Sequence, residues 1–346
     1  MNKETKVQVT IIVVLSIILI ILLLSVEKMN GFIFGYGMKP IEEEVEKETS
    51  KEDVDTGTKV NENSINLNNY NTNVTITKGG EYNISGTFNK TILIDSNEKV
   101  VLNLNNVTIN SDVTSAIANK GNSELVINVL KNTTNILKDN GSSEFDGCIY
   151  SSGKLTIEGT GILKVYGNQD EGEGIATTDA DITINGGEIY IESNDDGLNA
   201  GGDNGGIITI NGGNTTIKAN GDGIDSNGSL IINGGNIYTM GSSKGGDAGI
   251  DTDRTFEINA GEVIALGSDM IQNPDKSSKQ KYVTFTLDNS ISSGSKISLK
   301  KSNEEIISFE AKEDFKTLIL SNSKIKTGTY YLYVNGKKTN NSFTIN

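Results

Sequence analysis

Ile182-Thr-Ile-Asn-Gly186 and Ile208-Thr-Ile-Asn-Gly212 are two copies of the short pattern that decides the fold of this chain. The pattern is a run of β-forming residues that ends in Ile and leads into a tight turn. Five copies occur, and their central isoleucines are separated by 27, 26, 22 and 26 residues. A fixed period in this range is typical of a repeat architecture, in which each unit buries its apolar face by stacking on the next. The other three copies are Leu155-Thr-Ile-Glu-Gly159, Leu230-Ile-Ile-Asn-Gly234 and Phe256-Glu-Ile-Asn-Ala260.

One repeat divides into three short strands separated by turns. Residues 181–184 and 188–191 alternate as strands, residues 197–200 form a third, and the glycine-rich residues 201–206 close the coil. Three short parallel strands per coil are the pattern of a right-handed parallel β-helix. We therefore predict an all-β fold with such a helix over residues 64–273. Its first residues, up to about residue 95, are expected to cover the open end that every solenoid must protect.

The period stops after Asn273-Pro274. Six alternating runs then follow between turns rich in Gly, Asn and Ser, which predicts a small antiparallel β unit over residues 280–346 that caps the helix. The runs cover residues 282–287, 296–299, 306–309, 317–320, 330–334 and 342–345.

The first 63 residues differ from the rest in composition. Residues 7–26 carry no charge and are long enough to cross a ~30 Å hydrocarbon core as one helix. We predict a cytoplasmic stub and transmembrane anchor over residues 1–28, with a cleaved signal peptide as the alternative. Residues 29–63 are acidic and low in complexity, which predicts a disordered linker. Lys3 and Lys6 place the amino end in the cytoplasm, so the protein is expected in the cell membrane as a single-pass protein with most of the chain outside the cell.

Composition excludes several kinds of chemistry. The chain has no histidine, which rules out Ser-His-Asp and Cys-His catalysis and His-ligated zinc. Cys148 is the single cysteine and cannot form an internal disulfide. The formal net charge of −15 points away from nucleic acid as a partner. We expect a monomer.

Stacking places equivalent residues in columns. One column consists of asparagines, interrupted by Glu158, whose amides can hydrogen-bond from coil to coil. Another holds Tyr190 and Tyr238, two coils apart with Thr216 between them. Rings ~10 Å apart can carry two sugar residues, although exposed tyrosines are also ordinary β-formers. The asparagine column is expected to comprise Asn105, Asn128, Asn185, Asn211, Asn233 and Asn259.

A third column is acidic. Four motifs align on their Ile or Leu: Glu173-Gly-Ile-Ala176, Asp196-Gly-Leu-Asn199, Asp222-Gly-Ile-Asp225 and Asp247-Ala-Gly-Ile-Asp251. Carboxylates stacked ~4–5 Å apart repel by about 1 kcal/mol in water and about 4 kcal/mol at an effective dielectric near 20. Oxygen-only ligands favour a hard cation, and Ca²⁺ accepts irregular geometry better than Mg²⁺. The alternative is separate, solvated turn residues. The predicted calcium ligands are Asp195, Asp196, Asn199, Asp222, Asp225, Asp247, Asp251 and Asp253.

Three successive acidic motifs carry a family resemblance: Asp195-Asp-Gly-Leu-Asn-Ala200, Gly221-Asp-Gly-Ile-Asp-Ser226 and Gly246-Asp-Ala-Gly-Ile-Asp251. From about residue 64 onward the chain resembles a carbohydrate-binding domain family of bacterial, often clostridial, calcium-loaded parallel β-helix proteins. The resemblance implies a cell-surface protein with a pectate-lyase-like topology that binds plant-type polysaccharides such as cellulose or pectic acids. It assigns calcium to Asp195, Asp196, Asp222, Asp225, Asp247 and Asp251. Arg254 stands where the family has a small residue.

Three functions follow as hypotheses. The first is a non-catalytic, calcium-dependent polysaccharide-binding module. The second is a polysaccharide lyase, for which Arg254 is the one candidate base, although a neighbouring carboxylate would hold an arginine protonated. The third is a structural stalk or adhesin whose columns only stabilise it.

Overall fold

The computed structural model describes residues 57–346, except residues 61, 142–143 and 171. The predicted membrane anchor and most of the predicted linker lie outside the described residues. Within the described part, no helix is long and apolar enough to cross a membrane. Those residues contain one short 3-10 helix, η1 (Leu67–Asn69), and are otherwise strands and turns.

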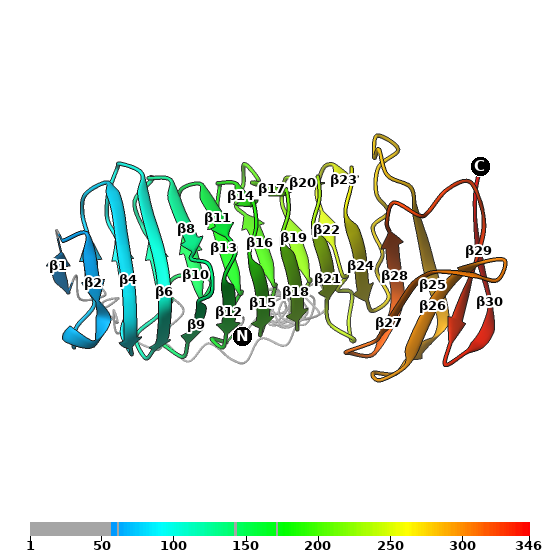
Figure 1. The fold of residues 1–346 in the computed structure, drawn as a ribbon, viewed down its shortest axis with the longest axis horizontal. Coiled ribbons are helices and arrows are strands. Elements are labelled where there is room, and N and C mark those ends of the chain that lie inside the picture. The colour runs from blue at the N-terminus through cyan, green and yellow to red at the C-terminus, as the bar shows by residue number, and fades with distance from the viewer. Residues whose placement is uncertain (1–56, 61, 142–143, 171) are drawn as a thin grey trace, which may run out of the picture. The chain divides into compact units, whose positions relative to one another are not determined.

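Short parallel strands stack along the molecule (Figure 1). They form a parallel β-solenoid of the right-handed type, as predicted. One face of each coil contributes a strand to a nine-stranded parallel sheet. That sheet contains β1 (Thr58–Val60), β3 (Val74–Ile76), β5 (Ile92–Ile94), β7 (Ile117–Asn119), β10 (Ile149–Ser151), β13 (Ile175–Thr178), β16 (Leu198–Gly201), β19 (Ile224–Ser226) and β22 (Asp251–Thr252).

The remaining faces belong to a second, larger sheet. One set of its strands is β2 (Ser64–Asn66), β4 (Gly80–Phe88), β6 (Val100–Ser111), β8 (Leu125–Val129), β11 (Leu155–Gly159), β14 (Ile182–Ile184), β17 (Ile207–Ile210), β20 (Ser229–Ile232) and β23 (Phe256–Ile258). The other set is β9 (Thr134–Asp139), β12 (Ile162–Gly167), β15 (Glu188–Ser193), β18 (Asn214–Ala219), β21 (Asn236–Met240) and β24 (Glu262–Gly267). The strands β4 and β6 are long enough to belong to both sets: β6 pairs with β8 of the first set and with β9 of the second, and β4 pairs with β6 along its whole length.

The five sequence repeats stack in register. Ile157 pairs with Ile184, and the same column continues coil by coil to Ile258. These side chains point inward and none of them is exposed to solvent. Burying each one stabilises the fold by about 1.5–3 kcal/mol. The spacing of the repeats therefore predicted both the strands and their alignment.

Glycine is required at one inner corner of the coils. Gly174, Gly197 and Gly223 each follow an acidic residue and precede the inward Ile or Leu. A Cβ on Gly197 would lie 2.5 Å from the carbonyl oxygen of Gly223 and would also clash with Ile217. A Cβ on Gly174 would meet the carbonyl oxygen of Gly197 at 2.7 Å in the same way. The glycine of the acidic-Gly-Ile motif thus lets neighbouring coils stack closely, while the acidic residue before it supplies charge.

We expect Gly197→Ala to lower the free energy of unfolding by about 1–3 kcal/mol, because the added methyl group overpacks the corner. Urea unfolding followed by circular dichroism measures the change. Gly246→Ala is the matched control, because a Cβ there has no neighbour within 4 Å. An unchanged unfolding midpoint for Gly197→Ala would contradict the steric assignment.

Asparagine columns are present, with one correction. Asn211 donates to Asn185 at 2.9 Å, and Asn233 and Asn259 extend the chain of amide hydrogen bonds. Beyond the interruption at Glu158, Asn128 donates to Asn103 at 2.8 Å. The prediction that Asn105 holds this register is wrong, because Asn103 pairs with Asn128.

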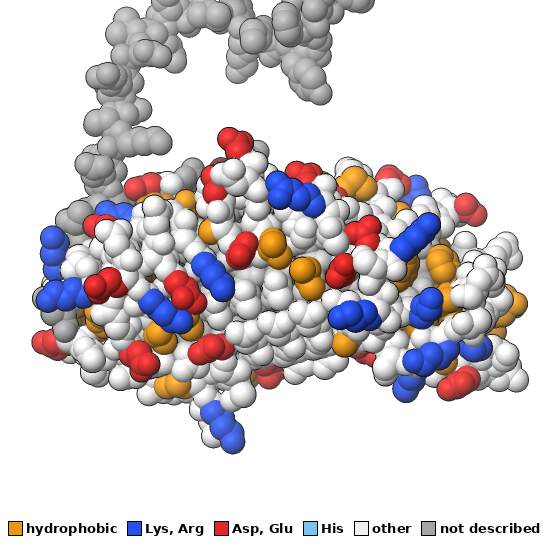
Figure 2. Space-filling model, turned by 90° about the horizontal axis from the view of Figure 1, so that it is seen from above, with side chains coloured by type: hydrophobic (Ala, Val, Ile, Leu, Met, Phe, Trp, Pro, Cys, Tyr) orange, Lys and Arg blue, Asp and Glu red, His pale blue; other side chains and the backbone are white. Residues whose placement is uncertain are grey.

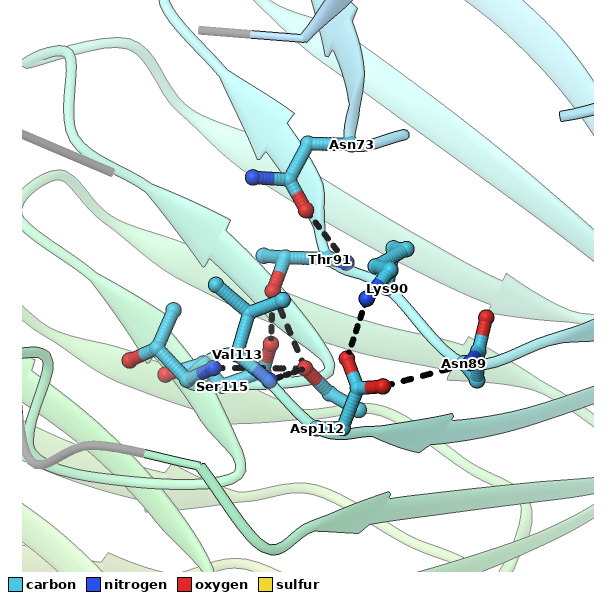
Figure 3. A network of polar contacts seen from close by, with 9 residues as sticks. Asn73, Asn89, Lys90, Thr91, Asp112, Val113 and Ser115 are labelled. Carbon is cyan, nitrogen blue, oxygen red and sulfur yellow. Dashed lines mark hydrogen bonds and ion pairs between the residues drawn. The ribbon is translucent and has the colours of Figure 1, made fainter. Parts of the chain in front are cut away.

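Polar contacts also link the first coils inside the structure (Figure 3). The Thr91 N–H donates to the amide oxygen of Asn73 at 3.0 Å, and the Thr91 hydroxyl donates to the Ser115 carbonyl oxygen at 2.8 Å. Nearer the surface, the Lys90 ammonium group donates to Asp112 at 2.7 Å. These bonds run from coil to coil and satisfy polar groups that stacking buries.

The solenoid begins earlier in the chain than predicted. β1 already pairs in parallel with β3, so the solenoid includes Thr58–Val60 and the predicted linker to residue 63 is too long. Residues 64–95 form regular coils and not a separate cover, because β2, β3, β4 and β5 all join the two parallel sheets.

The six predicted carboxyl-terminal strands are all present. β25 (Tyr282–Ile291) and β28 (Phe315–Ser321) extend the larger sheet, and β28 runs antiparallel to the last solenoid strand, β24. A separate antiparallel sheet has the order β27 (Glu304–Glu310), β26 (Lys296–Lys301), β29 (Gly328–Val334) and β30 (Lys337–Ile345). A second apolar core, which includes Leu299, Phe315 and Leu332, holds this unit together.

Candidate metal site

The acidic side chains lie along the nine-stranded sheet. Asn199 pairs with Asp225, and Asp225 pairs with Asp251, on β16, β19 and β22. Their neighbours Leu198 and Ile224 are fully buried, so alternation directs Asn199, Asp225 and Asp251 outward. Stacking therefore brings the last position of the predicted motifs into one column, which is acidic at Asp225 and Asp251.

The first acidic position forms a parallel column. The N–H of Asp222 donates to Asp196 Oδ1 at 2.7 Å, and the N–H of Ala248 donates to Asp222 Oδ1 one coil further on. Each aspartate thus uses one oxygen to satisfy a backbone group of the next coil. The other oxygen of Asp222 remains available as a ligand, whereas that of Asp196 accepts from the Asn199 amide.

Ala248 occupies this register in place of Asp247. The carbonyl oxygen of Ala248 accepts from the Gly223 N–H, as the Asp222 carbonyl accepts from Gly197 N–H in the preceding coil. The motif from Asp247 to Asp251 has one residue more than the motif from Asp222 to Asp225. Asp247 therefore lies one residue before the position that aligns with Asp222. Asp247 still acts on Asp222 through its charge.

Three carboxylates converge at the centre of the site. Asp222, Asp225 and Asp251 each offer one oxygen, and these oxygens lie within 4.8 Å of one another. Calcium–oxygen bonds are 2.3–2.6 Å long, so two ligands of one ion lie at most about 5 Å apart. The donor set therefore fits Ca²⁺ in both distance and chemistry. These three residues are members of the predicted ligand set.

The environment penalises negative charge at this cluster. Burial is the largest cause that raises the pKa of Asp225 to about 7, and the charges of Asp196, Asp251 and Asp253 add to it. Burial likewise raises the pKa of Asp222 to about 7, partly offset by the hydrogen bond from Ala248. The pKa of Asp196 also rises to about 7, chiefly through burial. At neutral pH these groups need protons or a cation.

The other predicted ligands surround the cluster. The Asn199 amide donates to Asp196 Oδ2 at 2.9 Å and to Glu173 Oε1 at 3.2 Å, so its nitrogen is engaged by carboxylates. Asp195 raises the pKa of Asp196 through its charge, and Asp253 does the same to Asp225. Asp195 and Asp253 thus add negative charge around the cluster, whereas Asn199 is a neutral hydrogen-bond donor within it.

Two further carboxylates extend the acidic column and were not among the predicted ligands. Glu173 is 6% exposed, and its Oε2 has no hydrogen-bond donor. Burial first, and then the neighbouring Asp146 carboxyl, raises the pKa of Glu173 far above its ordinary range. Glu173 was visible in the sequence alignment of motifs. Asp146 also had a signal in the sequence, because it precedes the inward Ile149 by the same spacing as Asp247 precedes Ile250.

The two tyrosines share a register, but they do not form a platform for two sugars. Tyr190, Thr216 and Tyr238 align on β15, β18 and β21. The Tyr238 ring packs edge-on against Phe309 at 5.8 Å, and its hydroxyl accepts from the Lys312 N–H and donates to the Glu310 carbonyl. The carboxyl-terminal unit thus contacts both the ring and the hydroxyl group of Tyr238. Tyr190 is 38% exposed and lies on a different face from the carboxylate cluster.

Arg254 follows β22 at the surface. Its guanidinium donates to the carbonyl oxygen of Asn204 at 3.1 Å, in the loop between β16 and β17. This contact directs the side chain along the solenoid to a loop two coils away. No contact in the described part of the chain gives Arg254 the role of a base.

Comparison with known proteins identifies the family. A family model for carbohydrate-binding domain-containing proteins matches residues 70–332. The chain belongs to this family. The carbohydrate-binding domain so defined includes almost the whole solenoid and most of the carboxyl-terminal unit. The family expected from the acidic motifs is therefore confirmed.

Two known proteins are similar to this carbohydrate-binding domain. A carbohydrate-binding domain-containing protein of Acetivibrio thermocellus is 34% identical over 131 residues, which span 35% of this chain and 45% of that relative. The chain thus matches less than half of the length of that relative. The solved structure of a polysaccharide lyase-like protein from C. thermocellum, a gadolinium derivative, has a TM-score of 0.47 and 28% sequence identity. The match covers 56% of this chain and 89% of the chain in the solved structure.

Proposed function

We propose that this protein is a calcium-dependent polysaccharide-binding module of the cell surface, held to the membrane by residues 7–26. The observation that carries the proposal is the convergence of Asp222, Asp225 and Asp251 within 4.8 Å. Membership of a carbohydrate-binding family supplies the class of ligand. The uncharged segment and the acidic linker after it support a module displayed outside the cell.

Asp222, Asp225 and Asp251 would hold the ion, and Asp196 and Asn199 would support them from the preceding coil. Bound Ca²⁺ supplies positive charge to a surface that otherwise repels acidic sugars. The side-chain amide of Asn199 orients the Asp196 carboxylate, and the backbone N–H groups fix one oxygen of Asp196 and of Asp222. Such fixed carboxylates give the site a defined shape before a ligand arrives. Pectic acids and cellulose are the proposed polysaccharides.

The test is binding to soluble polygalacturonate, measured by affinity electrophoresis with Ca²⁺ or with EGTA. We expect retardation with Ca²⁺ that EGTA abolishes, at about 0.5 M NaCl to screen exposed lysines. Cellulose pull-down under the same two conditions tests the neutral ligand, and Tyr190→Ala tests whether the exposed ring contributes. Equal retardation in Ca²⁺ and EGTA at this salt concentration would overturn calcium dependence. Failure to bind either glycan with Ca²⁺ present would favour a structural stalk.

A further inference from the structure

The carboxyl-terminal unit has the opposite charge to the rest of the protein. Residues 280–346 contain ten lysines and six acidic residues, a net charge of +4, in a chain whose formal net charge is −15. Lysine side chains lie on the surface of this unit (Figure 2). A local excess of one sign of charge attracts a polymer of the other sign. The unit is thus electrostatically distinct from the solenoid.

Two tyrosines lie on the outward face of the four-stranded sheet. On β29, Tyr330 and Leu332 are buried, whereas Tyr331 and Tyr333 are only partly buried and point to the other face. Tyr331 pairs with Lys300 on β26, and Tyr333 pairs with Lys338 on β30. The pairing places a lysine on each side of the tyrosine strand.

The tyrosines hold the two ammonium groups in place. The Lys338 ammonium nitrogen lies 3.4 Å from the Tyr331 ring centroid, and the Lys300 nitrogen lies 4.8 Å from the Tyr333 ring centroid. A cation–π contact at an exposed site is worth about 0.5–1 kcal/mol, enough to restrict a lysine rotamer but too weak to cancel its charge. The ammonium groups therefore keep hydrogen-bond donors for an external anion.

Carboxylates of the protein leave these lysines unpaired. Among the described residues, Lys300 and Lys338 form no ion pair within 4.0 Å, although Glu305 lies opposite Lys300 on β27. In contrast, Lys312 pairs with Glu310, and Lys316 pairs with Asp269. The pair formed by Lys300 and Lys338 is thus open to an external partner.

We propose that the outward face of β26, β29 and β30 binds a carboxylate-bearing polysaccharide without calcium. Charge complementarity selects a polyanion, and the family selects a glycan. The tyrosine edges beside the ammonium groups offer apolar surface to the sugar rings, while the ammonium groups bind the carboxylates. This site lies on the carboxyl-terminal unit, and it does not depend on the carboxylate cluster of the solenoid. The protein would then hold an acidic glycan at two chemically different places.

The experiment uses fluorescently labelled polygalacturonate and anisotropy in EGTA, so the calcium site contributes nothing. We expect binding at about 0.05 M NaCl that weakens at least about tenfold at about 0.5 M, where charges are screened. Lys300→Gln/Lys338→Gln should weaken binding about tenfold at the lower salt concentration. Lys300→Arg/Lys338→Arg should retain it. Tyr331→Thr should weaken it less, because it removes one ring and leaves both charges.

Lys276→Gln/Lys279→Gln is the matched control, since it removes the same charge from exposed positions off this sheet. Unchanged affinity in the control supports a specific site at Lys300 and Lys338. An equal loss of affinity in the control would show that binding depends on net charge alone, and it would overturn the proposal. Absence of binding in EGTA would also overturn it, whatever happens with Ca²⁺. Binding to phosphatidylglycerol vesicles without binding to polygalacturonate would replace the polysaccharide with a lipid surface. None of these outcomes bears on the calcium dependence tested above.

Discussion

We expect the melting temperature of the calcium-free protein to fall as the pH rises from about 4 to about 8. Asp196, Asp222 and Asp225 have pKa values raised to about 7 in the folded protein, while unfolded aspartates titrate near 3.8. Between these values the folded state binds more protons than the unfolded state. The stability that these three carboxyls contribute therefore decreases with pH across that interval, and it is fully present only below about pH 4. This direction is opposite to ordinary acid denaturation.

The expected size is large for a single group. One pKa unit corresponds to 1.36 kcal/mol, so the shift of Asp196 alone accounts for up to about 4 kcal/mol between acidic and mildly alkaline pH. Ca²⁺ replaces the lost protons, and it should add about 3 kcal/mol at pH 8 when present at a hundred times its dissociation constant. At pH 4 the carboxyls are protonated and the ion should add little.

Differential scanning calorimetry at several pH values, with Ca²⁺ or with EGTA, measures both effects. Mg²⁺ serves as the control cation, because it demands a smaller, octahedral site. A melting temperature in EGTA that rises between pH 4 and pH 8 would contradict the charge repulsion. So would an equal calcium effect at both ends of the range.

Asp225→Asn should have two opposite effects. It removes one charged ligand from the converging carboxylates, so the affinity for Ca²⁺ should fall at least about tenfold. In EGTA at pH 8 it should raise the free energy of unfolding by about 1 kcal/mol or more, because it removes a buried repulsive charge. Isothermal titration calorimetry gives the first quantity and urea unfolding gives the second.

Asp203→Asn makes the same substitution at an exposed loop position, and it should change neither quantity. If Asp225→Asn destabilises the calcium-free protein at pH 8, the aspartate has a structural role that outweighs its charge. If calcium affinity stays unchanged, Asp225 is not a ligand. The combination of weaker binding and greater calcium-free stability is specific to a preformed ion site.

The architecture could be predicted from the sequence because its repeats encode both strand and register. Inward isoleucines recur once per coil, and parallel stacking has no other arrangement that buries all of them. The error over Asn105 has a simple cause. Asn103 and Asn105 lie two residues apart on β6 and therefore share a face, so alternation fits both registers equally. Only the pairing of Leu102 with Ile127 distinguishes them.

The candidate site could be predicted in part. Asp222, Asp225 and Asp251 follow from repeated motifs, whereas Asp247 is displaced by one inserted residue whose accommodation depends on the corner geometry. The engagement of Tyr238 by the carboxyl-terminal unit could not be predicted, since it joins residues more than seventy positions apart. Contacts within one period are local in a solenoid, and contacts outside the period are not encoded by it.

The reversal of direction at β28 constrains how such proteins can lengthen. β28 lies antiparallel on β24, so the edge that a further parallel coil would need is already paired. Duplication of sequence between β24 and β28 would separate these two paired strands. A whole coil inserted between two earlier coils would leave that pairing intact. A longer descendant of this protein should therefore have gained its coils internally, and a coil copied from the acidic segment would add one more pair of carboxylates to the column.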